Sequence, residues 1–353
     1  MLAFDRNGVY IICTNVCANC FRGAEYMATL ADVAALAGCS VSVVSRVLKP
    51  RDDGSDRIAP ATRDRVREAA LELGYRPNRT AEFLKYGRVP EIGVFLPNFN
   101  NSLILDIVRG SSEAAREAGF PLSFFFDQQI GSFGSFMHDT IGRKNCGIIT
   151  CAPELEAVEK SFNLIKNYCD AGGYVVLIDN CKRGLVSSLR ATEVLVDDEY
   201  GGVLAATRLL ECGCENFFLQ APRRPRAFGF VRYLEAAGRE VTWLPKSEAG
   251  TGELFQMLMN YSGKAGVFCS SDRLAIRLYS RLAGAGEIPG NRIKLIGYDD
   301  TYNSDVLSPA LTSIRQPFFE SGRLAVKYLL DMIYNRPIEP EILKPVLIGR
   351  QTA

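Results

Sequence analysis

Residues 29–48 read TLADVAALAGCSVSVVSRVL. Thr29 is a favourable helix N-cap, and apolar residues recur at the spacing of one helical face over residues 30–37. Gly38 interrupts this pattern before a second amphipathic stretch at residues 41–48. Two short helices joined by about three residues that include a glycine have the spacing of a helix-turn-helix motif. In that motif the second helix enters the DNA major groove.

The segment around this motif, residues 27–88, has a helical pattern and is modestly basic. Pro60 suits the first turn of a third helix, and apolar residues at helical spacing extend that helix to about Leu73. The segment contains 11 basic and 8 acidic residues. This excess is compatible with DNA binding, and equally with a plain three-helix bundle whose charges are solvated. The charge therefore leaves both interpretations open.

The composition of the whole chain restricts its chemistry. Its 353 residues include 41 Lys and Arg against 40 Asp and Glu, so DNA binding would need a local basic patch. His138 is the one histidine, which excludes sites built from several imidazoles and disfavours a Ser-His-Asp enzyme. We expect His138 at the surface or half-buried, and we expect no metal, no cofactor and no enzymatic activity. The 11 cysteines are scattered, which favours free thiols in a reducing cytoplasm.

Residues 1–26 show neither helical nor strand periodicity. Cys13, Cys17 and Cys20 form a C-x3-C-x2-C pattern that can hold an iron–sulfur cluster, but three cysteines alone are a weak signal. Met27 begins the first clear helical pattern. We therefore expect Met27 to be the natural start, and residues 1–26 to be a disordered or non-native extension without function.

From residue 90 onward, strand and helix patterns alternate, which is typical of a parallel α/β fold. The expected strands cover 92–96, 122–126, 147–151, 174–178, 194–196, 217–220, 266–270 and 294–298, with a strand-like stretch at 345–349. The expected helices cover 102–118, 153–171, 199–211, 227–237, 252–261 and 272–283. The length suits two similar lobes, and ligands of such sheets bind at the carboxyl ends of the strands. We expect Phe124, Phe125 and Phe126 to be core strand residues.

The ordered pattern D-V-A-x-x-A-G-x-S-x-x-x-V-S-R-V-L at residues 32–48, with T-R-x-x-V and L-G-Y-x-P-N-x-x-A downstream, resembles the head of LacI/GalR-family transcription regulators. The resemblance continues through the I-G-Y-D-D run at residues 296–300 and covers residues 27–353. It implies a small all-α helix-turn-helix head and an α/β two-lobed sensor domain like periplasmic sugar-binding proteins.

The resemblance also implies the division of the chain. A helix-turn-helix DNA-binding domain would occupy residues 27–76, and a hinge helix with its linker residues 77–89. A two-lobed domain for ligand binding and dimerisation would occupy residues 90–353. The loop at 49–58 is longer and more acidic than is usual for the family, and Ala59 stands where a capping Ser is usual.

The resemblance places a set of side chains on DNA. Val41, Ser42 and Arg46 would face base edges, where Arg matches guanine O6 and N7 and Val can touch a thymine methyl. Leu84 would enter the minor groove as a wedge. The full set implied for DNA binding is Thr29, Val41, Ser42, Ser45, Arg46, Asn78, Ala81 and Leu84.

A second implied set would hold a small molecule. The carboxylate of Asp299 can accept two hydroxyl hydrogen bonds, and the guanidinium of Arg226 can grip hydroxyls or a carboxylate. Each residue also has a purely structural interpretation. Asp299, with Asp300, could cap a helix or belong to a surface loop, and Arg226 could form a salt bridge. The implied ligand-binding set is Asn101, Leu103, Asp179, Arg226, Ser271, Asp299 and Gln316.

The chain is therefore expected to be a cytoplasmic, ligand-responsive regulator. The resemblance implies a homodimeric repressor on a pseudo-palindromic operator in double-stranded DNA, switched by a sugar or sugar derivative between the lobes. The alternative is a sugar-binding transport-type protein without DNA function. The sequence leaves open the effector, its direction of action, the operator and any oligomer beyond a dimer.

Overall fold

The computed structural model describes residues 28–48, 58–75, 87–97, 102–127, 129–151, 158–178 and 189–353. The chain divides into two compact units, Met1–Glu82 and Phe83–Ala353. The expected extension at 1–26 and most of the expected hinge lie outside the described residues, so the expected domain boundaries stay predictions.

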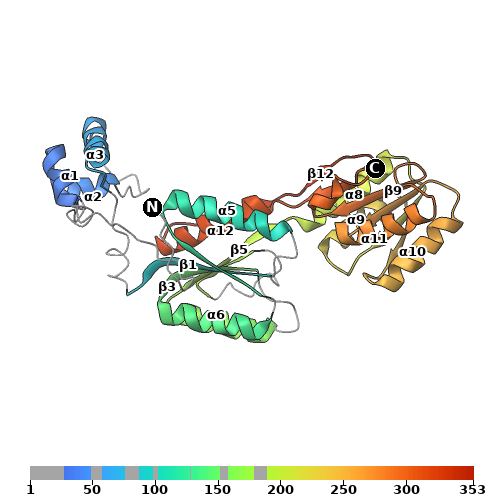
Figure 1. Cartoon of the computed structure of the whole chain (residues 1–353), viewed down its shortest axis with the longest axis horizontal. Coiled ribbons are helices and arrows are strands. Elements are labelled where there is room, and N and C mark those ends of the chain that lie inside the picture. The colour runs from blue at the N-terminus through green and yellow to red at the C-terminus, as the bar shows by residue number, and fades with distance from the viewer. Residues whose placement is uncertain are drawn as a thin grey trace, which may run out of the picture. The chain divides into compact units, whose positions relative to one another are not determined.

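Among its described residues, the first unit contains a head of three helices (Figure 1). Its helices are α1 (Leu30–Ala37), α2 (Val41–Leu48) and α3 (Pro60–Glu72), as the periodicity predicts. A capping box starts α1, because the Asp32 amide donates to Thr29 Oγ1 at 3.3 Å and the Thr29 amide donates to Asp32 Oδ2 at 2.7 Å. Gly38 ends α1 at φ 63°, a left-handed conformation that suits glycine.

The head has its own apolar core. The buried residues of that core are Val33, Ala34, Ala37, Val44, Val47, Val66, Ala69 and Ala70. Leu73 differs from expectation, since it caps α3 and is 37% exposed. Within the described ranges, no single helix is long and apolar enough to cross a membrane. The pair α1 and α2, bent by 104°, passes that length and composition test together.

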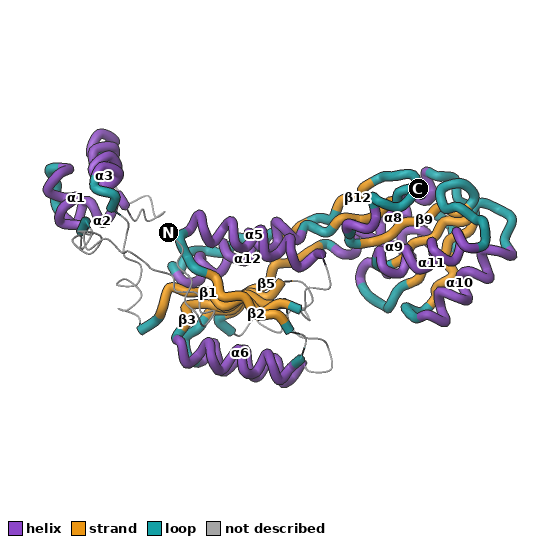
Figure 2. The backbone as a smooth tube through the Cα atoms, viewed as in Figure 1, coloured by secondary structure: helices purple, strands orange, loops and turns teal. Residues whose placement is uncertain are grey.

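The second unit contains two six-stranded sheets (Figure 2). The first sheet has the order β11-β5-β4-β3-β1-β2. Its strands are β1 (Val89–Leu96), β2 (Leu122–Phe126), β3 (Asn145–Thr150), β4 (Tyr174–Ile178), β5 (Ala191–Val196) and β11 (Ile342–Leu343). The helices of this first lobe are α5 (Ser102–Ala118), α6 (Ile130–Arg143), α7 (Val158–Asp170) and α12 (Phe318–Ile333). In Figure 1, α5 and α12 cover one face of this sheet and α6 covers the other.

The second sheet has the order β12-β10-β9-β8-β6-β7. Its strands are β6 (Asn216–Gln220), β7 (Val241–Leu244), β8 (Ala265–Cys269), β9 (Ile293–Tyr298), β10 (Thr312–Arg315) and β12 (Val346–Ile348). The helices of this second lobe are α8 (Asp198–Glu211), α9 (Pro225–Ala236), α10 (Glu248–Asn260) and α11 (Asp272–Gly284), and η2 (Tyr302–Ser304) is a 3₁₀ turn. The expected strands and helices thus recur with shifts of a few residues at their ends.

Several elements were not expected from the sequence. Helix α6 contains Gly131, Gly134 and Gly142, which weaken a helical signal, yet it buries Phe133 and Met137 against the first sheet. Helix α12 follows the second-lobe strand β10 but returns to pack against α5. The two backbones approach closely there, because a Cβ at Gly110 would overlap the carbonyl oxygen of Phe319.

The phenylalanine run lies in strand β2 and packs against the two cores of the first lobe, as expected. Phe124, Phe125 and Phe126 are half-buried rather than buried, because β2 is the last strand of its sheet. Phe125 packs against Phe136 with ring centroids 4.9 Å apart. The side chain of His138 is 90% exposed, as expected.

Candidate functional site

Helix α2 presents a polar and apolar outer face. Its Val44 and Val47 are buried in the head, whereas Val41 is 45% exposed and Ser42 and Arg46 are exposed. The Arg46 Nε donates to the carbonyl of Ser42 at 3.2 Å, which leaves its terminal nitrogens at the helix surface. An exposed valine beside a guanidinium offers a contact for a thymine methyl and a fork for guanine.

The other residues predicted to contact DNA have different settings. Ser45 is half-buried on the same helix. Thr29 is exposed, and its hydroxyl donates to Asp32 Oδ2 at 2.6 Å, so this side chain also holds the start of α1. Asn78, Ala81 and Leu84 lie outside the described residues, and their roles stay predictions.

The second sheet collects several of the predicted ligand residues at one edge. Strands β6, β8 and β9 are parallel neighbours. Arg226 begins α9 after β6, Ser271 caps α11 after β8, and Asp299 follows β9 directly. Because the carboxyl ends of parallel strands lie at one edge, these residues come together there.

Arg226 is held by contacts on three sides. Its Nε donates to Asp198 Oδ2 at 2.9 Å, and its Nη1 donates to the carbonyl of Ser270 at 3.1 Å. Its guanidinium also lies 3.8 Å from the ring centroid of Tyr298. Burial opposes its charge, but Asp198, Tyr298 and Asp299 together outweigh burial and raise the pKa of Arg226. The guanidinium is thus permanently charged and fixed in orientation.

Asp299 joins the same network. Its Oδ1 accepts from Gln316 Nε2 at 2.7 Å and lies 3.7 Å from Arg226 Nη1. Burial raises the pKa of Asp299 to about 7, although Arg226 and Gln316 act in the opposite direction. The backbone is strained here, since Asp299 has φ 108° and Asp300 has φ 52°, and such outliers are frequent at ligand sites.

Two buried polar atoms at this edge lack a partner. Gln316 is 7% exposed, and its Oε1 makes no hydrogen bond with any residue that the structure describes. The same holds for Ser271 Oγ. An unsatisfied buried polar atom costs free energy, which a bound hydroxyl group could recover. These atoms therefore fit a site for a polyhydroxylated ligand.

Close helix packing positions Asp198 on Arg226. Helices α8 and α9 cross at Gly202 and Gly229, where an added Cβ would overlap the carbonyl oxygens of Arg226 and Glu199 respectively. Tyr298 also donates its hydroxyl to Asp198 Oδ1 at 2.8 Å. The two glycines allow the backbones to approach closely enough for this ion pair to form.

Neighbouring acidic residues at the same edge have a structural role. Asp272 is fully buried and its Oδ2 accepts from the Thr301 amide and from Ser304 Oγ, both at 2.7 Å. Its Oδ1 accepts from Ser313 Oγ at 2.6 Å. Asp300 forms ion pairs of 2.7 Å with Arg315 and Arg350, so it stabilises the loop rather than facing outward.

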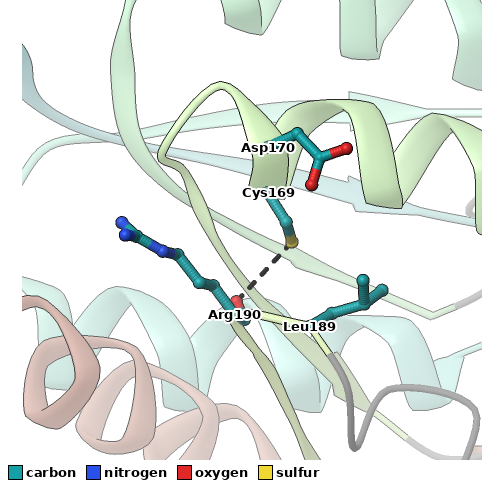
Figure 3. Close-up of a pocket in the computed structure, with 4 residues that line it drawn as sticks. All are labelled: Cys169, Asp170, Leu189 and Arg190. Atoms are coloured by element: carbon teal, nitrogen blue, oxygen red, sulfur yellow. Dashed lines mark hydrogen bonds between the residues drawn. The ribbon is translucent and has the colours of Figure 1, made fainter.

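The remaining predicted ligand residues are not joined to this network. Leu103 is 8% exposed in the core of the first lobe, and its role as a ligand contact stays a prediction. Asn101 and Asp179 lie outside the described residues. A small surface pocket of the first lobe, drawn in Figure 3, is lined by Cys169, Asp170, Leu189 and Arg190. It is formed by residues of the first lobe, away from the carboxyl edge of the second sheet.

Two members of this network were missed by sequence reasoning. Asp198 follows the end of β5, where the sequence predicts a helix start one residue later. Tyr298 lies in the predicted strand and is fully buried. The position of Asp198 directly after a predicted strand was a signal that could have identified it, and Tyr298 offered no comparable signal.

The fold and these sites define a class of DNA-binding regulator with a small helical head and a two-lobed sensor. Residues 29–78 match the family of bacterial regulatory proteins described as the lacI family, and residues 206–353 match a periplasmic binding protein-like domain. A ribose operon repressor of Bacillus subtilis is 30% identical over 348 residues, covering 92% of this chain and 98% of the repressor. The chain belongs to the LacI family of transcription regulators.

A further relative and a solved structure are also similar to this chain. The transcriptional regulator CelR of Thermobifida fusca is 29% identical over 329 residues, covering 88% of this chain and 94% of CelR. A solved complex of CelR with cellobiose has a TM-score of 0.64 and 26% identity, covering 92% of this chain and all of that one. These relatives are regulators rather than enzymes, and the fold predicted from the sequence is confirmed.

Proposed function

We propose that this chain is a cytoplasmic, homodimeric repressor whose affinity for a pseudo-palindromic operator is switched by a sugar or sugar derivative. The observation that carries the proposal is the outward face of α2, with Val41, Ser42 and Arg46 exposed beside a fully formed helical core. Two such heads match the two-fold symmetry of a palindromic operator.

The ligand half of the proposal rests on the Arg226–Asp299 network. Arg226 donates and an ionised Asp299 accepts, which together suit the hydroxyls of a polyol. Gln316 Oε1 and Ser271 Oγ add two buried groups that lack partners among the described residues. The repressor and regulator names of the relatives, and the cellobiose in the CelR complex, support a sugar-responsive role.

The proposed switch follows from differential binding. A ligand that binds one arrangement of the two lobes better shifts the population toward that arrangement. The expected hinge at residues 77–89 would carry this change to the head. Operator and ligand then change each other's affinity by the same factor.

A transport-type sugar-binding protein is the second candidate. The periplasmic binding protein-like match over residues 206–353 favours it. The head argues against it, since a transport protein needs no helix-turn-helix domain. Specific binding to DNA distinguishes the two.

The test is a band shift on DNA from the upstream region of the chain's own gene, at two salt concentrations. A salt-sensitive complex that survives competitor DNA is expected. Arg46→Ala should weaken it by about 1–3 kcal/mol and relax base choice at one half-site position. Arg67→Ala, which removes an exposed guanidinium from α3, is the matched control and should leave base choice unchanged. Absence of any specific complex for the unmodified chain would refute the regulator proposal.

A companion test addresses the ligand site. Asp299→Ala should lose the ligand's effect on the band shift, because the carboxylate and its contact with Gln316 disappear. Asp305→Ala changes an exposed acidic residue a few positions later and should keep the response. A normal response in Asp299→Ala would remove Asp299 from the ligand site.

A further inference from the structure

Basic side chains follow three neighbouring strands of the second sheet. Arg224 and Arg226 follow β6, Lys246 follows β7, and Arg273 follows β8 in the first turn of α11. These strands are mutually parallel in the order β7-β6-β8. Their carboxyl ends therefore bring four cations to the edge that already holds the Arg226–Asp299 network.

The loop that carries Lys246 is fixed in place. The buried Gln220, at the end of β6, donates through Nε2 to the carbonyl of Pro245 at 3.3 Å and to that of Ser247 at 3.1 Å. These two residues flank Lys246, so its backbone is held on both sides. Ser247 then caps α10 by accepting from the Gly250 amide at 3.0 Å.

The cations influence one another. Partial burial lowers the pKa of the Lys246 ammonium, and the guanidiniums of Arg273, Arg224 and Arg226 lower it further. Asp299 acts in the opposite direction. Lys246 and Arg273 have no hydrogen-bond or ion-pair partner for their side chains within the described part of the chain, and like charges held together without an anion repel.

The nearby carboxylates do not neutralise this group. Asp198 is bound by Arg226 and Tyr298, and Asp299 by Arg226 and Gln316. Glu248, the next acidic residue along α10, pairs with Arg277 and Arg281. The ring of Tyr298 is fully buried with Arg226 against one face, so it is not available to stack on a sugar. The edge therefore has an excess of positive charge, because each of these carboxylates already faces a guanidinium.

We propose that the effector is an anionic polyol, a sugar that carries a phosphate or carboxylate group, with the anion bound by Lys246 and Arg273 and the hydroxyls by Arg226 and Asp299. This inference rests on the proposed function and specifies the ligand class of the same site. The N-termini of α9, α10 and α11 begin at this edge and add favourable partial positive charge. A neutral sugar would leave Lys246 and Arg273 unused.

The first experiment needs no knowledge of the natural effector. Thermal unfolding of the full chain is measured with inorganic phosphate and with chloride at equal ionic strength. Phosphate should raise the Tm of the unmodified chain, because a ligand of the native state stabilises it by mass action. Lys246→Met and Arg273→Gln should each lose this shift. Lys264→Met and Arg239→Gln, whose residues lie before β8 and after α9, are matched controls that should keep it.

The second experiment distinguishes phosphate from carboxylate. Calorimetric titrations compare glucose, glucose 6-phosphate and glucuronate, and ribose with ribose 5-phosphate. An anionic member of the set should bind while its neutral counterpart does not. Lys246→Met should weaken that binding by about tenfold to a hundredfold, as expected for a hydrogen bond to a charged group.

The outcomes separate the two proposals. Equal phosphate shifts in all variants, or tighter binding of a neutral sugar that Lys246→Met leaves unchanged, would overturn the anionic class and leave the regulator function intact. Failure of the band shift would instead overturn the proposed function. Even if the band shift fails, a phosphate shift that is lost only in Lys246→Met and Arg273→Gln would support the ligand class.

Discussion

The two sheets of the second unit have the same strand order but different chemistry at their edges. The two strand orders become identical when β1 is matched with β6, β2 with β7 and β3 with β8. After β2, Asp127 accepts from the Gln129 amide at 3.0 Å and from Ser132 Oγ at 2.7 Å, so it organises the start of α6. After the matching β7 stands Lys246, which lacks such a partner among the described residues. The shared topology therefore brings the carboxyl ends of the strands together in both sheets. The side chains that follow those strands determine whether they stabilise the fold or can bind a ligand.

The largest expected effect comes from the buried carboxylate of the second lobe. Asp272→Ala leaves two hydroxyls and the Thr301 amide without their acceptor, which should cost about 3 kcal/mol or more of the free energy of unfolding. Asp127→Ala, at the start of a first-lobe helix, removes a partly exposed helix-start contact and should cost about 1 kcal/mol. Urea unfolding of both variants measures the difference. Equal losses in the free energy of unfolding would contradict the expectation that Asp272 contributes more to stability than Asp127.

A smaller effect is expected from the glycines that bring helices together. Gly229→Ala forces apart α8 and α9, and Gly110→Ala forces apart α5 and α12. Each should cost about 1–3 kcal/mol of stability, as is usual for overpacking. Gly229→Ala should in addition weaken ligand binding, since it moves Asp198 relative to Arg226. Denaturation and ligand titration of both variants test this, and equal ligand affinity would show that the α8–α9 contact does not position the site.

The effect that is smallest for a change of one pH unit is a pH dependence that arises in the second lobe. Burial raises the pKa of Asp299 from its ordinary value of 3.8 to about 7 in the folded state. Between these two pH values the folded state holds a proton that the unfolded state has released. Stability therefore falls as pH rises through this window, by at most about 1.4 kcal/mol per pH unit. Asp299→Asn should show a shallower decline, since the pKa of the buried Asp272 is raised as well. Unfolding measured from about pH 4 to about pH 8 checks it, and parallel curves for the two proteins would contradict a raised pKa at Asp299.

Local signals in the sequence account for the head and for most strands. Thr29, Gly38 and Pro60 act at helix ends, and the buried positions of α1 to α3 recur with helical spacing. Such signals depend on neighbours along the chain, which explains their success. Helix α6 was not predicted, because its glycines weaken the helical pattern of residues 130–143. Packing against β1 stabilises this helix in the folded protein.

For the candidate site, the sequence indicated single residues and the tertiary structure decided their partners. The family resemblance implied Arg226, Asp299 and Gln316 as ligand residues, and Asp299 in addition follows a predicted strand. Asp198 precedes Arg226 by 28 positions and reaches it only because two glycines let α8 and α9 meet.

By itself, the sequence determined the helix-turn-helix pattern, the alternation of strands and helices and the class of protein, since these depend on periodicity, caps and ordered motifs. The tertiary structure alone decided that Asp272 and Asp300 are structural and that α12 returns to the first lobe. It also decided that the cations after β6, β7 and β8 share one edge. The physical reason is that burial, close approach and the field of neighbouring charges depend on distances across the fold, which the order of residues along a chain does not specify.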